Sequence, residues 1–267
     1  MARRWVNLVG VTPLLLGMMV SVPPVVVTSV VMAQSSPSSQ QTEAQRLYEE
    51  GETLRGQGTR ESFQQALEKY QQALPLFRAV GDRSFEATTL NHIGFVYENT
   101  RQLEQALNFY QQALPIRKEV GDRSGEALTL TDIGNVYRSI GQPQQALNFY
   151  QQALPILREV GDRRGEASTL NLIGEVYRGI GQPQQALNFY QQALPILREV
   201  DDPTGAVTTL NNIRTVHRTM GNSQEIFRVC GNSSGTNVGS NPIAGSSTFT
   251  PPCYSAPPPS SRRGNTR

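Results

Sequence analysis

Cysteine, histidine and tryptophan are scarce in this 267-residue chain, which contains two, two and one of them. The histidines His92 and His217 lie far apart, and no Cys or Ser near either one is placed as an activated nucleophile. Neither a metal-ligand spacing nor a phosphate-binding loop occurs. These absences predict a protein that is not an enzyme and needs no metal and no cofactor.

The two cysteines, Cys230 and Cys253, both lie near the C-terminal end. In an exported chain they could form a disulfide. The alternative is two free thiols in a segment that holds no fixed geometry, and we favour it. From residue 231 onward the sequence consists mainly of Ser, Gly, Pro, Thr and Asn, with almost no charge. That composition predicts a disordered tail over residues 231–267.

Neither positive nor negative charge is in clear excess. The chain holds 24 Lys and Arg against 22 Asp and Glu, and residues 42–220 hold 18 against 21, a formal charge of −3. Binding to a phosphate backbone depends on releasing counterions with an excess of basic side chains. The composition therefore predicts no nucleic-acid partner.

The N-terminal segment has the pattern of an export signal. Arg3 and Arg4 precede a run without charge from Val6 to Val31, and Val31-Met32-Ala33 ends it with a cleavage-like site. We predict a signal peptide over 1–33, a linker over 34–41, and a periplasmic or secreted protein with no membrane contact after cleavage. The alternative is an uncleaved N-terminal membrane anchor, which Pro23-Pro24 and the Ser-rich stretch after the run disfavour.

Between these ends the chain is periodic. The string Gln-Gln-Ala-Leu-Pro begins at Gln71, Gln111, Gln151 and Gln191, always 40 residues apart. A fixed period of this length is typical of stacked supersecondary units rather than of one globular core. Each unit contacts mainly its neighbours, so the array offers long surfaces, and such surfaces usually bind other molecules.

Each unit contains two helical patterns. In the first, apolar residues and a glycine recur at spacings of three and four, as in Leu170, Ile173, Gly174 and Tyr177. In the second, the recurring residues are Ala186, Tyr190 and Ala193 and their equivalents. Glycine inside a helix costs about 0.5–1 kcal/mol, so its return in every unit predicts close packing of a partner helix against it.

The helix ends are also repeated. Aspartates precede each first helix and suit the N-cap position, and glycines before three of them suit a left-handed helix end. Prolines recur inside each second helix, where one proline costs roughly 3 kcal/mol and favours a bend. These positions are Asp82, Asp122, Asp162 and Asp202, then Gly81, Gly121 and Gly161, then Pro75, Pro115, Pro155 and Pro195.

This unit resembles the tetratricopeptide repeat, whose pattern is followed by Leu170, Ile173, Gly174, Tyr177, Ala186, Tyr190 and Ala193. At 40 residues it resembles the longer variant found in kinesin light chains and in bacterial arrays. The resemblance implies an all-α fold, a right-handed superhelical solenoid of antiparallel helix pairs. We predict an array over 42–230 with four full repeats and a degenerate fifth. The first repeat fits the pattern only if Gly51 takes the glycine place.

The third and fourth units, 121–160 and 161–200, differ at six positions, and five of them form one stripe on the first helix. These pairs are Leu128/Ser168, Thr131/Asn171, Asp132/Leu172, Asn135/Glu175 and Ser139/Gly179. In tetratricopeptide arrays the first helices line the concave groove, so the resemblance implies that this stripe selects a partner. Drift after a recent duplication is the alternative explanation.

The groove candidates are the polar and aromatic residues of the stripe and its equivalents in the second to fifth units: Thr88, Asn91, Phe95, Glu98, Thr131, Asn135, Arg138, Asn171, Glu175, Arg178, Asn211, Thr215 and Arg218. Most of the stripe is expected to face solvent. Asn and Arg can bind an extended peptide backbone or acidic side chains.

Taken together, these features predict an exported scaffold that binds a protein or an extended peptide through its concave groove, without catalysis. The alternative is a regulatory or sensor array that acts with a separately encoded enzyme, such as a caspase-like protease. Composition and periodicity do not determine the partner or the oligomeric state.

Overall fold

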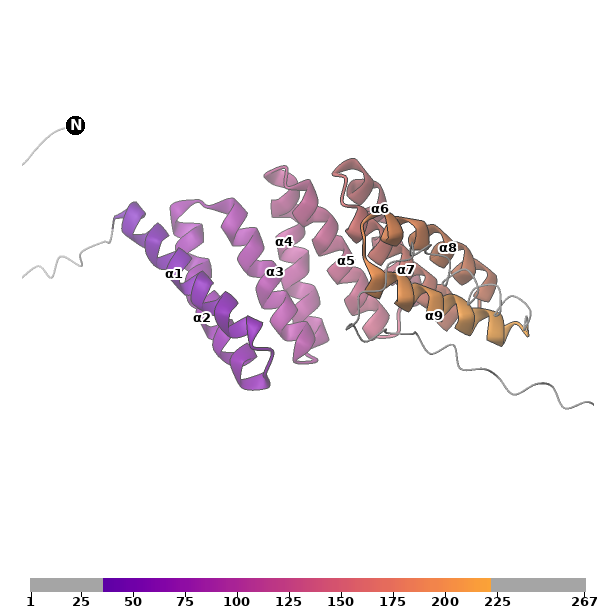
Figure 1. Ribbon diagram of the computed structural model, residues 1–267. Helices are drawn as coiled ribbons and strands as arrows, with labels where there is room; N and C mark the ends of the chain where they lie inside the picture. Colours follow the sequence, from indigo (N-terminus) through magenta and orange to yellow (C-terminus); the bar gives the residue numbers. More distant parts are fainter. Residues whose placement is uncertain (1–35, 222–267) are drawn as a thin grey trace, which may run out of the picture. The chain divides into compact units, whose positions relative to one another are not determined.

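The computed structural model describes residues 36–221, and these residues form nine α-helices and no strand (Figure 1). The helices follow one another with short turns and pair in sequence order. Their bounds are α1 (Pro37–Gly56), α2 (Arg60–Val80), α3 (Arg83–Asn99), α4 (Leu103–Glu119), α5 (Arg123–Ser139), α6 (Pro143–Glu159), α7 (Arg163–Gly179), α8 (Pro183–Glu199) and α9 (Pro203–Thr219).

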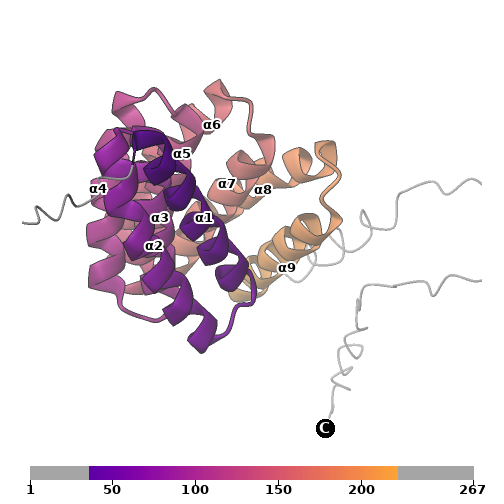
Figure 2. The same cartoon turned by 90° about the vertical axis from the view of Figure 1, so that its left-hand side faces the viewer.

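The odd-numbered helices are the first helices of the predicted repeats, and the even-numbered ones are the second helices. Each second helix packs on the first helix of its own repeat and on that of the next one. Seen from the α1 end, successive pairs are turned relative to one another (Figure 2). The all-helical solenoid of antiparallel pairs predicted from the sequence is confirmed over the described residues.

Several predictions concern residues outside the described range. These are the signal peptide over 1–33, the tail over 231–267, the second helix of the fifth repeat, and both cysteines. The array boundary that we placed at residue 42 is corrected, because α1 begins at Pro37. Ser36 caps this helix by accepting the Ser39 N–H, and Pro37 occupies its first turn, where proline is favourable.

The repeated caps have the predicted roles. The Asp82, Asp122, Asp162 and Asp202 side chains each accept the backbone N–H three residues further on, at 2.8–3.0 Å. Gly81, Gly121 and Gly161 take φ values of 71–74° at the preceding turn, a conformation that glycine adopts without strain. The prolines lie within continuous second helices and are exposed. The carbonyl that each leaves without a helical partner belongs to an exposed Gln four residues earlier.

A tyrosine packed on a glycine joins the two helices of each repeat. Tyr70, Tyr110, Tyr150 and Tyr190 are completely buried. A Cβ atom added to Gly51, Gly94, Gly134 or Gly174 would lie only 2.5–2.7 Å from a ring atom of the tyrosine in the same repeat. Only glycine, which has no Cβ, leaves room for the ring at this position of the first helix. The assignment of Gly51 to the glycine place of the first repeat is thereby confirmed.

Ion pairs join neighbouring repeats at three equivalent places. Glu86, Glu126 and Glu166, each nearly inaccessible to solvent, pair with an arginine three residues earlier. Each also faces a basic residue at the end of the preceding second helix. The same arginines, Arg83, Arg123 and Arg163, reach the glutamate that ends the second helix of their own repeat, at 2.7–2.8 Å. The arginine and the buried glutamate together thus connect three consecutive helices. The helix α9 lacks this network, because Pro203 and Ala206 replace the arginine and the glutamate.

Gly134→Ala tests the tyrosine contact. The added methyl collides with the Tyr150 ring, so we expect a loss of roughly 1–3 kcal/mol of unfolding free energy, despite the better helix propensity of alanine. Gly179→Ala is the matched control, because no atom lies within 4 Å of its added Cβ. We expect the control to be neutral or to stabilise by up to about 1 kcal/mol. Urea unfolding measures both, and equal effects of the two changes would contradict the contact.

Candidate functional site: the first-helix surface

The first helices of consecutive repeats touch one another through side chains. Tyr48 of α1 lies 3.2 Å from His92 of α3, Arg138 of α5 pairs with Glu175 of α7 at 2.6 Å, and Asn171 of α7 donates to Thr209 of α9 at 2.8 Å. Among the described residues, no side-chain hydrogen bond joins one second helix to the next. The first helices therefore lie closest together, and we call the surface that they share the first-helix surface.

Six of the thirteen predicted groove residues make side-chain hydrogen bonds or ion pairs to other helices. Asn91, Glu98, Asn135, Arg138, Asn171 and Glu175 belong to this group. Thr88, Thr131 and Thr215 bond only to a backbone carbonyl four residues earlier in their own helix. Phe95 is half-buried, and Arg178, Asn211 and Arg218 are exposed.

The expectation of a mostly solvent-facing stripe needs correction at Asn91. Its side chain is only 3% exposed, because its amide donates to Asp132 at 3.1 Å and to Thr129 at 3.4 Å across the junction with the next repeat. A buried amide group needs such partners. Asn91 thus holds two repeats together, whereas Leu128 is exposed to solvent.

The buried tyrosines reach this surface with their hydroxyl groups. The Tyr110 hydroxyl donates to Glu98 and the Tyr150 hydroxyl to Asn135, both at 2.8 Å. Tyr190 has no such partner among the described residues, because Glu175, which replaces Asn135 in the fourth repeat, pairs with Arg138 instead. The residues that vary along the stripe therefore also decide whether the hydroxyl of each core tyrosine has a hydrogen-bond acceptor.

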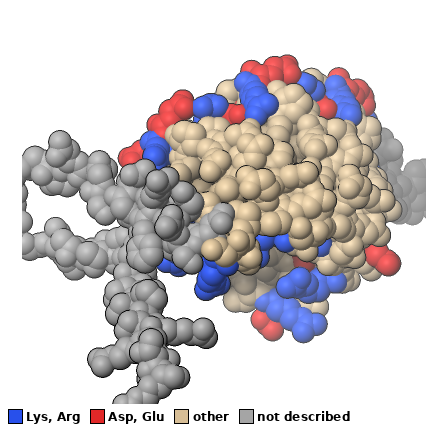
Figure 3. All heavy atoms as spheres, turned by 90° about the vertical axis from the view of Figure 1, so that its right-hand side faces the viewer, with Lys and Arg blue, Asp and Glu red and all other residues tan. Residues whose placement is uncertain are grey.

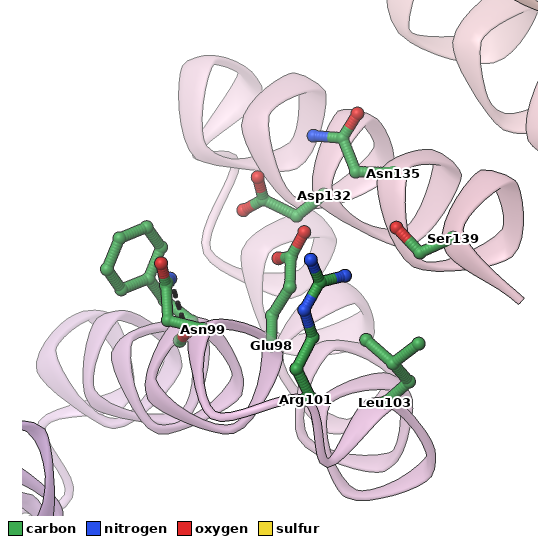
Figure 4. A pocket seen from close by; sticks show the side chains of 8 residues that line it. Glu98, Asn99, Arg101, Leu103, Asp132, Asn135 and Ser139 are labelled. Carbon is green, nitrogen blue, oxygen red and sulfur yellow. Dashed lines mark hydrogen bonds between the residues drawn. The ribbon is translucent and has the colours of Figure 1, made fainter. Parts of the chain in front are cut away.

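A cavity of about 380 Å³ opens between the second and third repeats (Figure 4). Two carboxylates, Glu98 from α3 and Asp132 from α5, project into the same part of it. Asn135 faces them from α5, and Arg101 enters from the turn before α4. The lining is completed by Phe95, Asn99, Leu103 and Ser139.

Burial and mutual repulsion disfavour charge on the two carboxylates. Burial, together with the smaller effect of the neighbouring Glu98, raises the pKa of Asp132 to about 7, although the hydrogen bond from Asn91 acts in the opposite direction. Burial also raises the pKa of Glu98, while the Tyr110 hydroxyl and the charge of Arg138 act in the opposite direction. The cavity therefore holds two acidic groups that form no ion pair within the described residues.

Arg101 takes a backbone conformation that is uncommon for its residue type. Its φ is 64°, at the place where the later repeats have Gly141, Gly181 and Gly221 with φ values of 74–76°. A side chain in this left-handed region costs on the order of 1 kcal/mol. Comparison of the repeats in sequence already places Asp132 on the stripe, and it also shows Arg101 where later repeats have glycine, but neither residue is among the thirteen groove candidates.

The remaining chemistry of this surface is limited. His92 is half-buried, stacks on Tyr48, and its Nδ1 atom lies 2.7 Å from a carboxylate oxygen of Glu52. Among residues 36–221 no group of three or more His, Cys, Asp or Glu side chains is placed to hold a metal ion. No helix within that range is long and apolar enough to cross a membrane.

The end face of the array beside α9 is mostly neutral, with charged side chains of both signs along its upper and lower margins (Figure 3). This mixture agrees with the low net charge of the sequence. On this face no broad area of one sign is present among the described residues.

Fold and surface together define an array of helix pairs with a side-chain pattern specific to each repeat. The sequence profile of the tetratricopeptide repeat family matches residues 58–119, 85–159, 125–199 and 165–228. These ranges span more than half of the chain, and the chain therefore belongs to the tetratricopeptide repeat family. None of the curated proteins matches it.

Solved structures share the fold at low sequence identity. The putative kinesin light chain of Podospora anserina is 16% identical, with a TM-score of 0.59 over 72% of this chain and 94% of that one. Aspartyl phosphate phosphatase F from Bacillus subtilis is 16% identical, with a TM-score of 0.65 over 74% and 51%. The Rap conjugation gene regulator of plasmid pLS20, solved with the Phr* peptide, is 19% identical, with a TM-score of 0.56 over 78% and 57%.

The raised pKa of Asp132 predicts a pH dependence of stability. Between about pH 4 and 7 the folded chain keeps a proton on this carboxyl that the unfolded chain releases, so its contribution falls as the pH rises. Asp132→Asn retains the acceptor for Asn91 and does not titrate. We expect the melting temperature of the variant, relative to the original chain, to rise from pH 4.5 to pH 8. A difference that stays constant over this range would contradict a raised pKa.

Proposed function

We propose that this chain is a scaffold that binds a protein or an extended peptide segment on its first-helix surface, and that it performs no catalysis itself. The observation that carries the proposal is the contrast between the two helices of each repeat. The second helices of the third and fourth repeats, 143–159 and 183–199, are identical, whereas the first helices differ along one stripe. A surface that varies while its supporting helices do not is suited to selecting a partner.

The similar structures support binding of this kind. The pLS20 regulator shares the fold of this chain and was solved with a bound peptide. Arrays of helix pairs form extended surfaces that suit extended segments. On the first-helix surface Arg178, Asn211 and Arg218 are exposed and form no ion pair within the described residues. These side chains provide donors for backbone carbonyls or carboxylates of a bound segment.

An exchange between repeats tests where the partner binds. The variant Leu128→Ser, Thr131→Asn and Ser139→Gly gives the third repeat three residues of the fourth. None of the three side chains bonds to another helix, so the expected loss of stability is about 1 kcal/mol, mainly from the glycine. We expect the set of proteins retained by the immobilised chain to change, because a few central residues usually dominate an interface. Quantitative mass spectrometry of the retained proteins measures this.

The matched control is Gln151→Ala with Gln191→Ala, two exposed positions at which the second helices agree. It alters the opposite helices by a similar amount of surface. If the control weakens retention and the stripe exchange does not, the partner binds the second helices, and the first-helix surface is the wrong site.

We further propose that the chain is exported and that residues 1–33 are removed as a signal peptide. The support is the sequence pattern of Arg3, Arg4, the uncharged run and the Val31-Met32-Ala33 site. The protein recovered from the exported fraction is expected to begin at Gln34, as measured by intact mass. Recovery of the uncleaved chain in the membrane fraction would instead show an anchor.

A further inference from the structure

At the cavity between the second and third repeats, residues of the first-helix surface differ from their equivalents in other repeats. The position of Glu98 is occupied by Arg138, Arg178 and Arg218 in the following repeats, so only the second repeat has an acid there. The position of Asp132 is occupied by His92, Leu172 and Asn212 in the second, fourth and fifth repeats, and by Glu49 in the first. Two acidic residues at different positions of the repeat thus line one cavity.

Among the described residues neither carboxylate forms an ion pair, although Arg101 lines the same cavity and the charge of Arg138 acts on Glu98. Glu98 accepts from the Tyr110 hydroxyl and Asp132 from the Asn91 amide, both of which are neutral donors. One oxygen of each carboxylate is left without a donor in the described chain. Elsewhere in the array the buried Glu86, Glu126 and Glu166 are matched by arginines. Uncompensated acids in a half-enclosed site are costly unless a cation reaches them.

The shape and the other walls suit one long side chain. A volume of about 380 Å³ lies near the lower end of the range typical of ligand pockets, roughly 300–1,000 Å³. Phe95 and Leu103 offer apolar contact for a methylene stem. Asn135 adds a side-chain amide to the lining, and the Arg55 guanidinium, which pairs with Glu52, lies 5.3 Å from the centroid of the Phe95 ring.

Resting on the proposed function, we propose that the segment bound on the first-helix surface places a lysine or arginine side chain in this cavity, between Glu98 and Asp132. The incoming cation forms charge-assisted hydrogen bonds with the free carboxylate oxygens. Arg101, which lines the same cavity without an ion pair to either acid, repels the incoming charge and limits its affinity.

The proposal also predicts how the affinity for the cationic side chain changes with pH. A cation binds the ionised carboxylates, and burial holds the pKa of Asp132 at about 7 and raises that of Glu98. Affinity is therefore expected to increase as the pH rises from 6 to 8. Tyr110, Arg138 and Arg101 face the same acids, and none of these groups ordinarily changes its charge in this range.

The test uses the purified chain and a phage-displayed library of random dodecapeptides. We expect the selected peptides to share one lysine or arginine, and its replacement by norleucine in a synthetic peptide to weaken binding about tenfold or more. Glu98→Gln with Asp132→Asn should weaken the lysine peptide to a similar extent and leave the norleucine peptide unaffected. Arg101→Gly, the residue of the later repeats, should strengthen the lysine peptide about threefold.

The matched control is Glu68→Gln with Glu104→Gln, which removes the same charge from two exposed positions on second helices. It should leave the affinity for the lysine peptide unchanged. Selected peptides without a shared cation, or equal binding by the cavity variant and this control, overturn the cation site while the scaffold function stands. A selection that enriches no peptide at all overturns the peptide-binding function and the cation site with it.

Discussion

The packing of one tyrosine on one glycine is the contact on which the rest of this structure depends. It sets how closely the two helices of each repeat approach, and it recurs in all four described pairs with the ring fully buried. Because the ring fills the space where a Cβ would stand, neither residue can change alone without loss of packing. The contact fixes the geometry of a pair, and stacking of pairs then follows from the apolar faces that remain on both sides.

Neighbouring pairs are held by a second repeated device, a buried glutamate that pairs with an arginine of its own helix and with a basic residue of the preceding second helix. This network lies at the N-terminal ends of the first helices, away from the middle of the stripe. Conserving the frame at the helix ends leaves the middle of each first helix free to differ. Glu98, in the last turn of α3, and Asp132, Asn135 and Glu175, further inside their helices, give each junction its own polar arrangement.

The same positions serve structure and recognition at once. Asn135 satisfies a core tyrosine and also lines the cavity, while Glu175 leaves the next tyrosine without that bond and pairs with Arg138. A single substitution on the stripe therefore changes both the surface chemistry and the local hydrogen bonds. For that reason the exchange experiment uses only Leu128, Thr131 and Ser139, whose side chains form no bond to another helix.

The sequence by itself determined the period, the helix pairs, their caps and the close approach of the second helix at each repeated glycine, because each of these is a local pattern repeated in register. That the ring of the repeated tyrosine is what packs on this glycine came from the tertiary structure. The sequence also indicated Gly51 as the glycine of the first repeat, although the spacing there is irregular. Only the tertiary structure decided that Asn91 is buried between repeats, and that Glu98 and Asp132 share a cavity with Arg101. Periodicity says on which helix face a residue lies, but its partners come from the next repeat, 34 to 41 residues away. The distance between those residues depends on how the pairs stack, which no single repeat encodes.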